Sequence, residues 1–264
     1  MTDVVKFDIS DYVATITINR PEAMNSMNPE VRLGLSQALD EVERNKDIWI
    51  AVITGEGEKS FSAGADLKHF AKEKDATKDQ KTSWKKMLAQ TIPLTERWYF
   101  PKPIIAQVNG FALGGGLELA LACDIIVAAE HAEFGLPEPR RGLIAGGGGV
   151  HRLPRMIGLK QAMGYMLTGR HMSANRAFEL GLVNEVVKTS NLEEAVNKWI
   201  IDIKKCSPLS IRATKEAAMR GLDMPLAQAY HMHYDSERTR AQGSDTKEGP
   251  KAFAEKREPI WSGE

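Results

Sequence analysis

The sequence predicts an α/β fold with a mostly helical C-terminal part. Up to Val150, short apolar runs that suit buried strands alternate with stretches of helical periodicity. This order of strand, helix and strand is typical of right-handed crossover connections in a largely parallel sheet. Beyond Val150 helical patterns dominate, so a set of helices is expected to follow the α/β core.

The first strands and helices are predicted from the spacing of apolar residues and from residues that typically begin or end a helix. Apolar and polar residues alternate on both sides of Asp11, as in a β-hairpin. Asn28 followed by Pro29 is typical of a helix start, because asparagine caps the first turn and proline suits it. Short apolar runs that end at turn residues predict buried strands. The predicted order is a hairpin at residues 4–9 and 13–18, a helix at 28–43, a strand at 48–54, a helix at 83–98, a strand at 104–108, a helix at 115–123 and a strand at 125–128.

The second half reads as a series of helices. These are predicted at residues 159–167, 174–180, 192–205, 209–221 and 225–240. Residues 68–86 are highly charged and poor in apolar side chains, which is typical of a surface loop or an exposed helix.

Charge and cysteine content exclude several functional classes. The 264 residues include 35 basic and 35 acidic side chains, so no global field attracts nucleic acid or an anionic membrane, and any anion site must be local. Cys123 and Cys206 have no metal-ligand spacing, so we expect neither a disulfide nor a metal site. No apolar run reaches the ~18 residues of a membrane span, and no signal segment is recognised. A cytoplasmic location is expected.

Two glycine-containing segments follow predicted strands. In Ala63-Gly64-Ala65-Asp66 the small side chains would let backbone N–H groups approach a ligand, although Asp66 could simply cap the next helix. Gly114-Gly115-Gly116 precedes an apolar helix, whose positive dipole end could hold an oxyanion. The Walker lysine and the dinucleotide-binding glycine spacing are both missing, which leaves plain turn formation as the main alternative.

Two glutamates stand out in this context. Glu118 lies in a nearly all-apolar helical segment, where a carboxylate must be paired, hydrogen-bonded or protonated. An arginine could neutralise it in a purely structural role. Glu138 lies between two prolines that restrict its backbone, although a loop carboxylate bonded to Arg140 or Arg141 fits equally well.

The order and spacing of several motifs resemble the crotonase (enoyl-CoA hydratase/isomerase) superfamily over nearly the whole chain. The motifs are Ala63-Gly64-Ala65-Asp66-Leu67, Asn109-Gly110, residues 114–120, Cys123-Asp124, Phe134-Gly135-Leu136-Pro137-Glu138 and residues 146–149. The resemblance implies a ββα spiral core, which we place at residues 1–200, and a helical trimerisation region at residues 201–264. It also implies a homotrimer or a hexamer built as a dimer of trimers.

The resemblance further implies roles for single residues. The N–H groups of Ala65 and Gly115 would form the oxyanion hole for a thioester carbonyl, and Glu118 and Glu138 would flank a catalytic water. Isomerases of the superfamily generally keep the second glutamate and lack the first, so the pair favours a hydratase. Coenzyme A, a part of the substrate rather than a cofactor, would contact Ala23, Met24, Ala63, Ala65, Asp66, Leu67, Lys68, Phe253 and Lys256, the last two often from a neighbouring subunit.

The expected function is therefore an enoyl-CoA hydratase of lipid metabolism. The alternatives are an isomerase that uses Glu138 alone and a non-catalytic acyl-CoA- or RNA-binding relative, the latter disfavoured by zero net charge. The chain departs from many hydratases at Pro139-Arg140-Arg141 and at Ala145, beside the expected acyl pocket, which would suit a polar or charged acyl group. Residues 248–261 resemble carnitinyl-CoA dehydratases. Five histidines, His131, His151, His171, His231 and His233, have no metal spacing and are expected to be structural or exposed.

Overall fold

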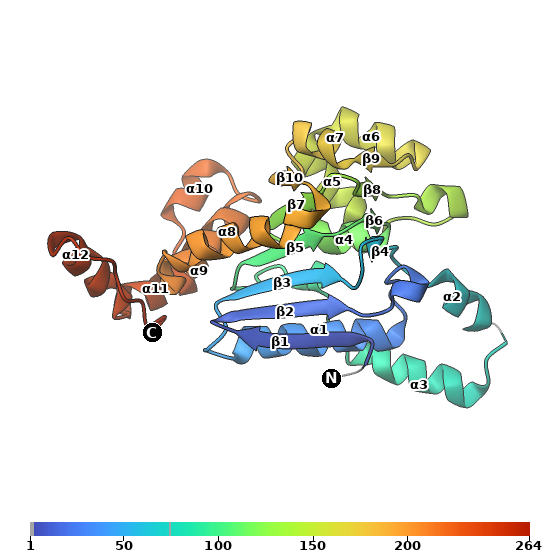
Figure 1. Cartoon of the computed structure of the whole chain (residues 1–264), viewed down its shortest axis with the longest axis horizontal. Helices are drawn as coiled ribbons and strands as arrows, with labels where there is room; N and C mark the ends of the chain where they lie inside the picture. The colour runs from blue at the N-terminus through green and yellow to red at the C-terminus, as the bar shows by residue number, and fades with distance from the viewer. Residues whose placement is uncertain (1–2, 74) are drawn as a thin grey trace.

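Two β-sheets lie at the centre of the computed structural model, which describes residues 3–73 and 75–264 (Figure 1). The larger sheet has the strand order β1-β2-β3-β5-β7-β10, antiparallel between β1 and β2 and parallel elsewhere. The smaller sheet has the order β4-β6-β8-β9, antiparallel only between β8 and β9. The strands are β1 (Val5–Ser10), β2 (Val13–Ile18), β3 (Ile50–Gly55), β4 (Ser60–Ser62), β5 (Ile104–Val108), β6 (Phe111–Leu113), β7 (Ile125–Ala129), β8 (Glu133–Gly135), β9 (Met172–Ser173) and β10 (Glu185–Val187).

The chain alternates between these sheets. The strands β3, β5 and β7 of the larger sheet are each followed directly by a strand of the smaller sheet, and then by one or more helices. The predicted ββα spiral core is thereby confirmed. The helices are α1 (Pro29–Arg44), α2 (Leu67–Glu73), α3 (Lys78–Ala89), α4 (Gly115–Leu121), α5 (Gly149–Ile157), α6 (Leu159–Thr168), α7 (Ala174–Glu179), α8 (Leu192–Lys204), α9 (Pro208–Gly221), α10 (Leu226–His231), α11 (Asp235–Gln242) and α12 (Asp245–Ala254), with short 3₁₀ turns η1 (Pro21–Ala23), η2 (Leu94–Glu96), η3 (Glu138–Arg141) and η4 (Thr189–Asn191).

The central strands of the larger sheet are buried on both faces, which explains why they are continuously apolar. In β3, Ala51 and Ile53 belong to the core cluster that includes the apolar faces of α1 and α4. Ile50 and Val52 point to the other face, where they belong to a second cluster with residues of α8. A strand that is covered on both faces has apolar side chains on both, so its sequence does not alternate between apolar and polar residues.

Most of the predicted elements are confirmed to within a few residues. β1 and β2 form the predicted hairpin, with Val5 opposite Ile18 and Ser10 opposite Val13. Asn28 caps α1, because its Oδ1 accepts a hydrogen bond from the Val31 N–H at 2.9 Å. The charged stretch at residues 68–86 lies largely in α2 and α3, two helices at the edge of the molecule.

Two predicted helices are wrong in their extent. The helix predicted at residues 83–98 is α3 at Lys78–Ala89, which starts earlier because Thr77 and Gln80 form a reciprocal capping box. It also ends before Pro93. The single helix predicted at residues 225–240 is two helices, α10 and α11. Between them Tyr234 adopts an extended backbone and buries its ring to 5% exposure.

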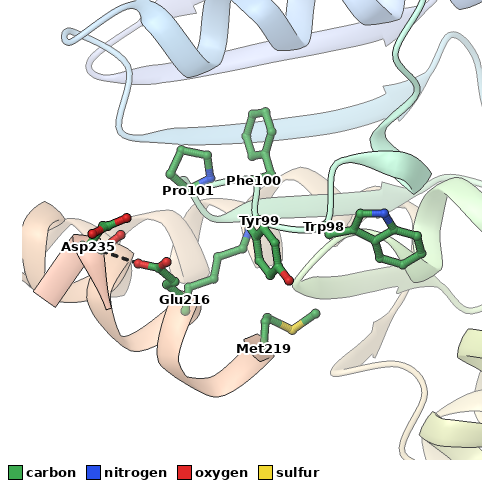
Figure 2. Close-up of a pocket in the computed structure, with 9 residues that line it drawn as sticks. Trp98, Tyr99, Phe100, Pro101, Glu216, Met219 and Asp235 are labelled. Atoms are coloured by element: carbon green, nitrogen blue, oxygen red, sulfur yellow. Dashed lines mark hydrogen bonds between the residues drawn. The ribbon is translucent and has the colours of Figure 1, made fainter. Parts of the chain in front are cut away.

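The C-terminal helices gather at one end of the molecule, and α12 reaches furthest from the sheets (Figure 1). They meet the body of the chain at residues 98–101, across a small cavity of about 110 Å³ that Met219 of α9 also lines (Figure 2). The Arg220 guanidinium lies 4.9 Å from the Tyr99 ring centroid and 5.7 Å from that of Tyr234.

The division of the chain at residue 200 stays a prediction, and α8 runs through that point. Within the described ranges, none of the helices has both the length and the apolar character needed to cross a membrane.

Candidate active site

A cavity of about 1110 Å³ opens where the loop after β4, the start of α4 and the turn η3 come together. It is lined by both predicted catalytic glutamates, Glu118 and Glu138, and by Ala65 and Gly115. Segments that are distant in the sequence, each placed at the end of a strand, therefore contribute to one site.

Two backbone segments, residues 62–66 and residues 113–118, form the part of this cavity that we call the cavity floor. They pack so closely that glycine is required. A Cβ atom on Gly64 would lie 2.7 Å from the Gly115 nitrogen, and one on Gly116 would overlap the Ser62 carbonyl. Gly64 also has φ +82°, a left-handed conformation that side chains disfavour. The floor is thus a contact of backbone against backbone.

The amides of Ala65 and Gly115 lie side by side across this contact. A Cβ atom on Gly115 would lie 3.7 Å from the Ala65 nitrogen. Gly115 is the first residue of α4, where N–H groups have no partner within the helix. Their neighbours are engaged, since Gly64 O accepts from Met27 N–H at 2.7 Å and Gly114 N–H donates to Gly135 O at 2.8 Å. Neither the Ala65 nor the Gly115 N–H donates to a protein acceptor in the described part of the chain.

Glu118 lies on the first turn of α4 and is 6% exposed. Its Oε1 accepts a hydrogen bond from the Gly149 N–H at 2.9 Å, so the glycine run before α5 serves to bring amides to this carboxylate. Burial raises the pKa of Glu118, while the Gly149 and Gly147 amides and the positive charges of Arg152 and Arg32 oppose that rise. No ion pair joins Glu118 to an arginine within the described residues, so main-chain amides hold it instead.

Glu138 is the first residue of η3 and points toward the cavity floor. A Cβ atom on Gly114, which has φ +55°, would lie 2.9 Å from Glu138 Oε1. Glu138 Oε2 is buried and has no hydrogen-bond partner among the described residues. Burial raises the pKa of Glu138, its own backbone N–H opposes the rise, and the negative charge of Glu118 adds to it. The alternative of a carboxylate bonded to Arg140 or Arg141 is wrong for the described residues, since neither arginine bonds to Glu138 and Arg140 Nε donates to the Thr168 carbonyl at 2.7 Å.

The two carboxylates therefore share one cavity in unlike surroundings. Glu118 receives amide donors that favour its ionised form, whereas one oxygen of Glu138 is buried without any donor. Such a pair can divide acid and base roles, because amide donors favour the ionised form of Glu118 and no donor does so at Glu138 Oε2.

The residues predicted to contact coenzyme A fall into two groups. Ala63 and Leu67 line the cavity, as Ala65 does. Ala23 and Met24 lie beside them, since the Ala63 N–H donates to the Met24 carbonyl at 2.9 Å. Lys68 is exposed on α2 and does not line the cavity.

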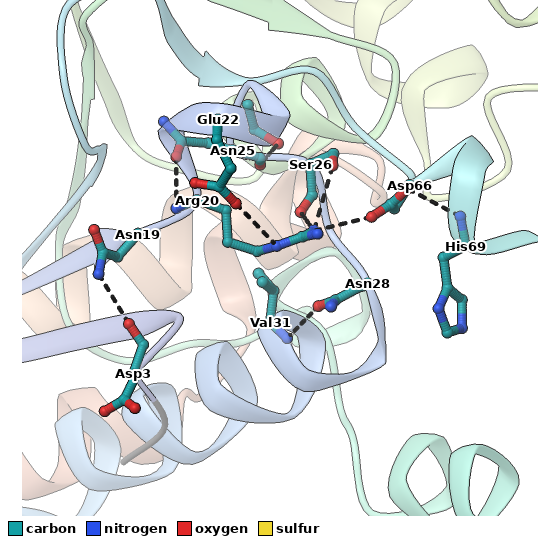
Figure 3. Close-up of polar contacts among 11 residues, drawn as sticks. Asp3, Asn19, Arg20, Glu22, Asn25, Ser26, Asn28, Val31, Asp66 and His69 are labelled. Carbon is teal, nitrogen blue, oxygen red and sulfur yellow. Dashed lines mark hydrogen bonds and ion pairs between the residues drawn. The ribbon is translucent and has the colours of Figure 1, made fainter. Parts of the chain in front are cut away.

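Asp66 caps α2 and anchors the neighbouring loop (Figure 3). Its Oδ1 accepts from the His69 N–H at 3.0 Å, and its Oδ2 pairs with Arg20 Nη1 at 3.0 Å. Burial raises the pKa of Asp66, but the His69 amide and Arg20 outweigh it and lower the pKa overall. Arg20 Nη1 also donates to the Ser26 carbonyl at 2.7 Å, so the pair ties the loop after β2 to the cavity floor. The capping role considered for Asp66 is confirmed.

Phe253 and Lys256 lie at or just after the end of α12, whereas α2 lies at the opposite end of the molecule (Figure 1). The Phe253 ring is 87% exposed. Neither residue lines the cavity of its own chain. Their contact with coenzyme A stays a prediction, and it requires a second copy of the chain.

Sequence reasoning missed three polar side chains that line the cavity, Arg32, Lys81 and His171. Arg32 comes from the start of α1, and burial lowers its pKa while the charge of Glu118 opposes this. His171 is exposed as expected, and it also lines the cavity, with its Nδ1 2.7 Å from Glu133 Oε2. No local signal marks these positions, because the cavity is formed only when α1, α3 and β9 pack against the core.

Comparison with known proteins gives a consistent result. The family model described as enoyl-CoA hydratase/isomerase matches residues 8–264. The chain is 41% identical to (E)-benzylidenesuccinyl-CoA hydratase of Thauera aromatica, over 98% of this chain and 99% of the relative. It is 38% identical to carnitinyl-CoA dehydratase of Salmonella typhimurium, over 95% of each.

Solved structures agree with this assignment. Enoyl-CoA hydratase from Bacillus anthracis superposes with a TM-score of 0.89 at 36% identity, covering 99% of this chain and 100% of the other. Enoyl-CoA hydratase from Mycobacterium tuberculosis H37Rv gives a TM-score of 0.87 at 37% identity, with 100% of both chains covered. The chain therefore belongs to the enoyl-CoA hydratase/isomerase (crotonase) family and is an enzyme of that family.

Proposed function

We propose that this enzyme is a hydro-lyase that adds water to, or removes it from, the α,β double bond of an acyl-CoA thioester. The observation that carries the proposal is that Glu118 and Glu138 line the same cavity as Ala65 and Gly115. Hydration of an α,β-unsaturated thioester requires groups of these two kinds: a pair of ionisable carboxyl groups and a pair of amides without protein acceptors.

In this proposal the amides of Ala65 and Gly115 bind the thioester carbonyl oxygen. When water attacks the β-carbon, negative charge moves onto that oxygen, and donors that are already in place stabilise it without reorganisation. The close contact of the cavity floor supports this role, because it fixes the spacing between the two amides.

Glu118 is assigned as the base and Glu138 as the acid. The amide of Gly149 favours an ionised Glu118, which would take the proton of the attacking water as the hydroxyl group bonds to the β-carbon. The buried, unpartnered Oε2 of Glu138 favours a protonated carboxyl, which would deliver its proton to the α-carbon. Dehydration is the same path in reverse.

The wider assignment stays part of the proposal. Coenzyme A would bind as part of the substrate along residues 63–67, with Lys68 near its phosphates and with no further cofactor. The enzyme would act in the cytoplasm as a homotrimer or hexamer. Phe253 and Lys256 of a neighbouring copy would then reach the nucleotide, which their position on the exposed end of α12 supports.

The test is to replace each carboxylate by its amide. Glu118→Gln and Glu138→Gln are each expected to lower kcat for crotonyl-CoA hydration by about 10²–10⁴-fold, because each removes a proton-transfer group. The loss of absorbance at the conjugated thioester band measures turnover, and titration with a saturated acyl-CoA should show unchanged affinity. Glu58→Gln, at an exposed glutamate, is the matched control.

Wild-type turnover in both variants would contradict the two-carboxylate mechanism. A normal Glu118→Gln variant combined with an inactive Glu138→Gln variant would instead indicate an isomerase that moves the proton with Glu138 alone. Assaying double-bond migration in a β,γ-unsaturated acyl-CoA separates the two reactions.

A further inference from the structure

We propose that the acyl pocket selects an acyl group that carries its own carboxylate at the end remote from the thioester. The substrate class is then the mono-CoA thioester of an unsaturated dicarboxylic acid, bound through Arg141 with help from Arg140 and Arg32. This inference rests on the proposed function for the position of the thioester. The three arginines line the cavity that contains both glutamates.

The position of the arginines assigns them to the acyl group rather than to coenzyme A. Arg140 and Arg141 share the single turn η3 with Glu138, and a 3₁₀ turn rises only about 2 Å per residue. Glu138 is proposed to act at the α-carbon, next to the thioester carbonyl. The phosphates of coenzyme A lie beyond the long, uncharged pantetheine arm. Positive charge beside Glu138 therefore faces the acyl chain.

Within the described residues none of these guanidinium groups forms a salt bridge with a carboxylate, although the charge of Glu118 acts on Arg32. Arg141 and Arg32 form no ion pair or side-chain hydrogen bond within residues 3–73 and 75–264, and Arg140 uses only Nε, on the Thr168 carbonyl. Arg140 and Arg141 are exposed where they line the cavity, so a bound acyl group would withdraw their charges from water, and its carboxylate would supply the partner that they then need.

The net charge of the cavity lining also favours binding of an anionic acyl group. Among the described residues that line it, Arg32, Arg140 and Arg141 outnumber the acidic Glu118 and Glu138. The chain as a whole is neutral, so this excess of positive charge is a local property of the site.

The segment that carries the arginines also offers an apolar surface. We call residues 138–144 the cavity rim. Leu143 and Ile144 follow the arginines, line the same cavity and are 52% and 71% exposed. An acyl chain with apolar methylenes would cover these two side chains and bring a terminal carboxylate to the neighbouring guanidinium groups. A neutral acyl chain of the same length would cover Leu143 and Ile144 but leave the cations unpaired.

The experiment compares affinity for two unreactive ligands, adipyl-CoA and heptanoyl-CoA, by isothermal titration calorimetry. The wild type is expected to bind adipyl-CoA about 10-fold more tightly or better, as a charge-assisted hydrogen bond allows. Arg141→Met should remove most of that preference while leaving the affinity for heptanoyl-CoA within about twofold. Arg141→Lys should retain part of it. Arg155→Met is the matched control, because Arg155 is an exposed arginine that donates only to the His151 carbonyl.

Turnover of the unsaturated counterparts, didehydroadipyl-CoA and heptenoyl-CoA, distinguishes this inference from the proposed reaction. Equal wild-type affinity for adipyl-CoA and heptanoyl-CoA, or equal losses for both ligands in Arg141→Met, would overturn carboxylate selection whatever the turnover. If the affinity preference is present and is lost in Arg141→Met, the selection stands. Hydration of neither unsaturated ester would then refute only the reaction assignment.

Discussion

The cavity floor and the cavity rim face the same space but are built in different ways. In the floor, backbone segments touch so closely that a side chain on Gly64 or Gly116 would collide with main-chain atoms. In the rim, Arg141, Leu143 and Ile144 are exposed, and a side chain on Gly142 would meet no atom within 4 Å. The floor therefore fixes the positions of the amides and of Glu118, whereas the rim can change its side chains without disturbing the fold. In the proposed function, the floor supplies the amides and Glu118, whereas the rim supplies Glu138 together with the side chains proposed to select the acyl group.

The largest effect is expected from adding one methyl group to the floor. Gly116→Ala should lower the free energy of unfolding by about 3–5 kcal/mol, since its Cβ would overlap the Ser62 carbonyl and neither backbone can move freely. Urea denaturation measures the loss. Gly164→Ala is the control, because Gly164 lies in helix α6 with open space around it, and alanine should stabilise that helix by up to about 1 kcal/mol. Similar unfolding midpoints for the two variants would mean that the floor is not tightly packed.

A smaller effect is expected where floor and rim meet. Gly114→Ala would place a Cβ atom 2.9 Å from Glu138 Oε1 and displace the proposed acid, so kcat/KM should fall about 10²-fold. Gly142→Ala provides the comparison, because Gly142 also has positive φ but no neighbouring atom within reach. Steady-state assays with the variants side by side measure the difference. Equal losses would attribute the effect to backbone strain rather than to the position of Glu138.

The smallest expected effect is on the pH dependence of the free energy of unfolding, to which both Glu118 and Glu138 contribute. Burial raises the pKa of both Glu118 and Glu138, so the folded protein holds protons that the unfolded chain releases. Proton binding by these two carboxyl groups stabilises the folded state fully below the ordinary glutamate pKa of about 4.3. This stabilisation is lost as the pH rises through the pKa values of the folded state. The double variant Glu118→Gln, Glu138→Gln should therefore be more stable than the wild type at pH 7.

Thermal or urea unfolding between pH 4 and 8 tests this prediction, and the advantage of the double variant should shrink toward the acid end. A constant difference across that range would show that the two glutamates do not titrate differently in the folded and unfolded protein.

Much of the core was predictable because its signals are local. The buried strand β5 matches the predicted residues 104–108, and Asn28 caps α1 as expected. The prediction that Glu118 and Glu138 belong to one site came from motif order and spacing rather than from periodicity, and the cavity that both line agrees with it. Local pattern and motif spacing thus supplied complementary information.

The features that sequence reasoning missed depend on tertiary packing. Arg32 reads as an ordinary residue in the first turns of α1, and only the packing of that helix turns it toward the cavity. The break between α10 and α11 has no proline or glycine signal, and it lies where Tyr234 is buried beneath the guanidinium of Arg220. The start of α3 is an exception, because the pair Thr77 and Gln80 is a capping signal present in the sequence.

The amides of Ala65 and Gly115 belong to the main chain, so they respond to substitution differently from the side chains of the two glutamates. A main-chain donor is common to every amino acid, so most point mutations at Ala65 leave an N–H in place, provided that the adjoining glycines persist. Glu118 and Glu138, by contrast, can each be lost through a single codon change. Under the proposed mechanism, the scaffold could therefore lose its hydration chemistry in one step and still hold a thioester whose carbonyl the amides polarise, ready for other side chains to act on it.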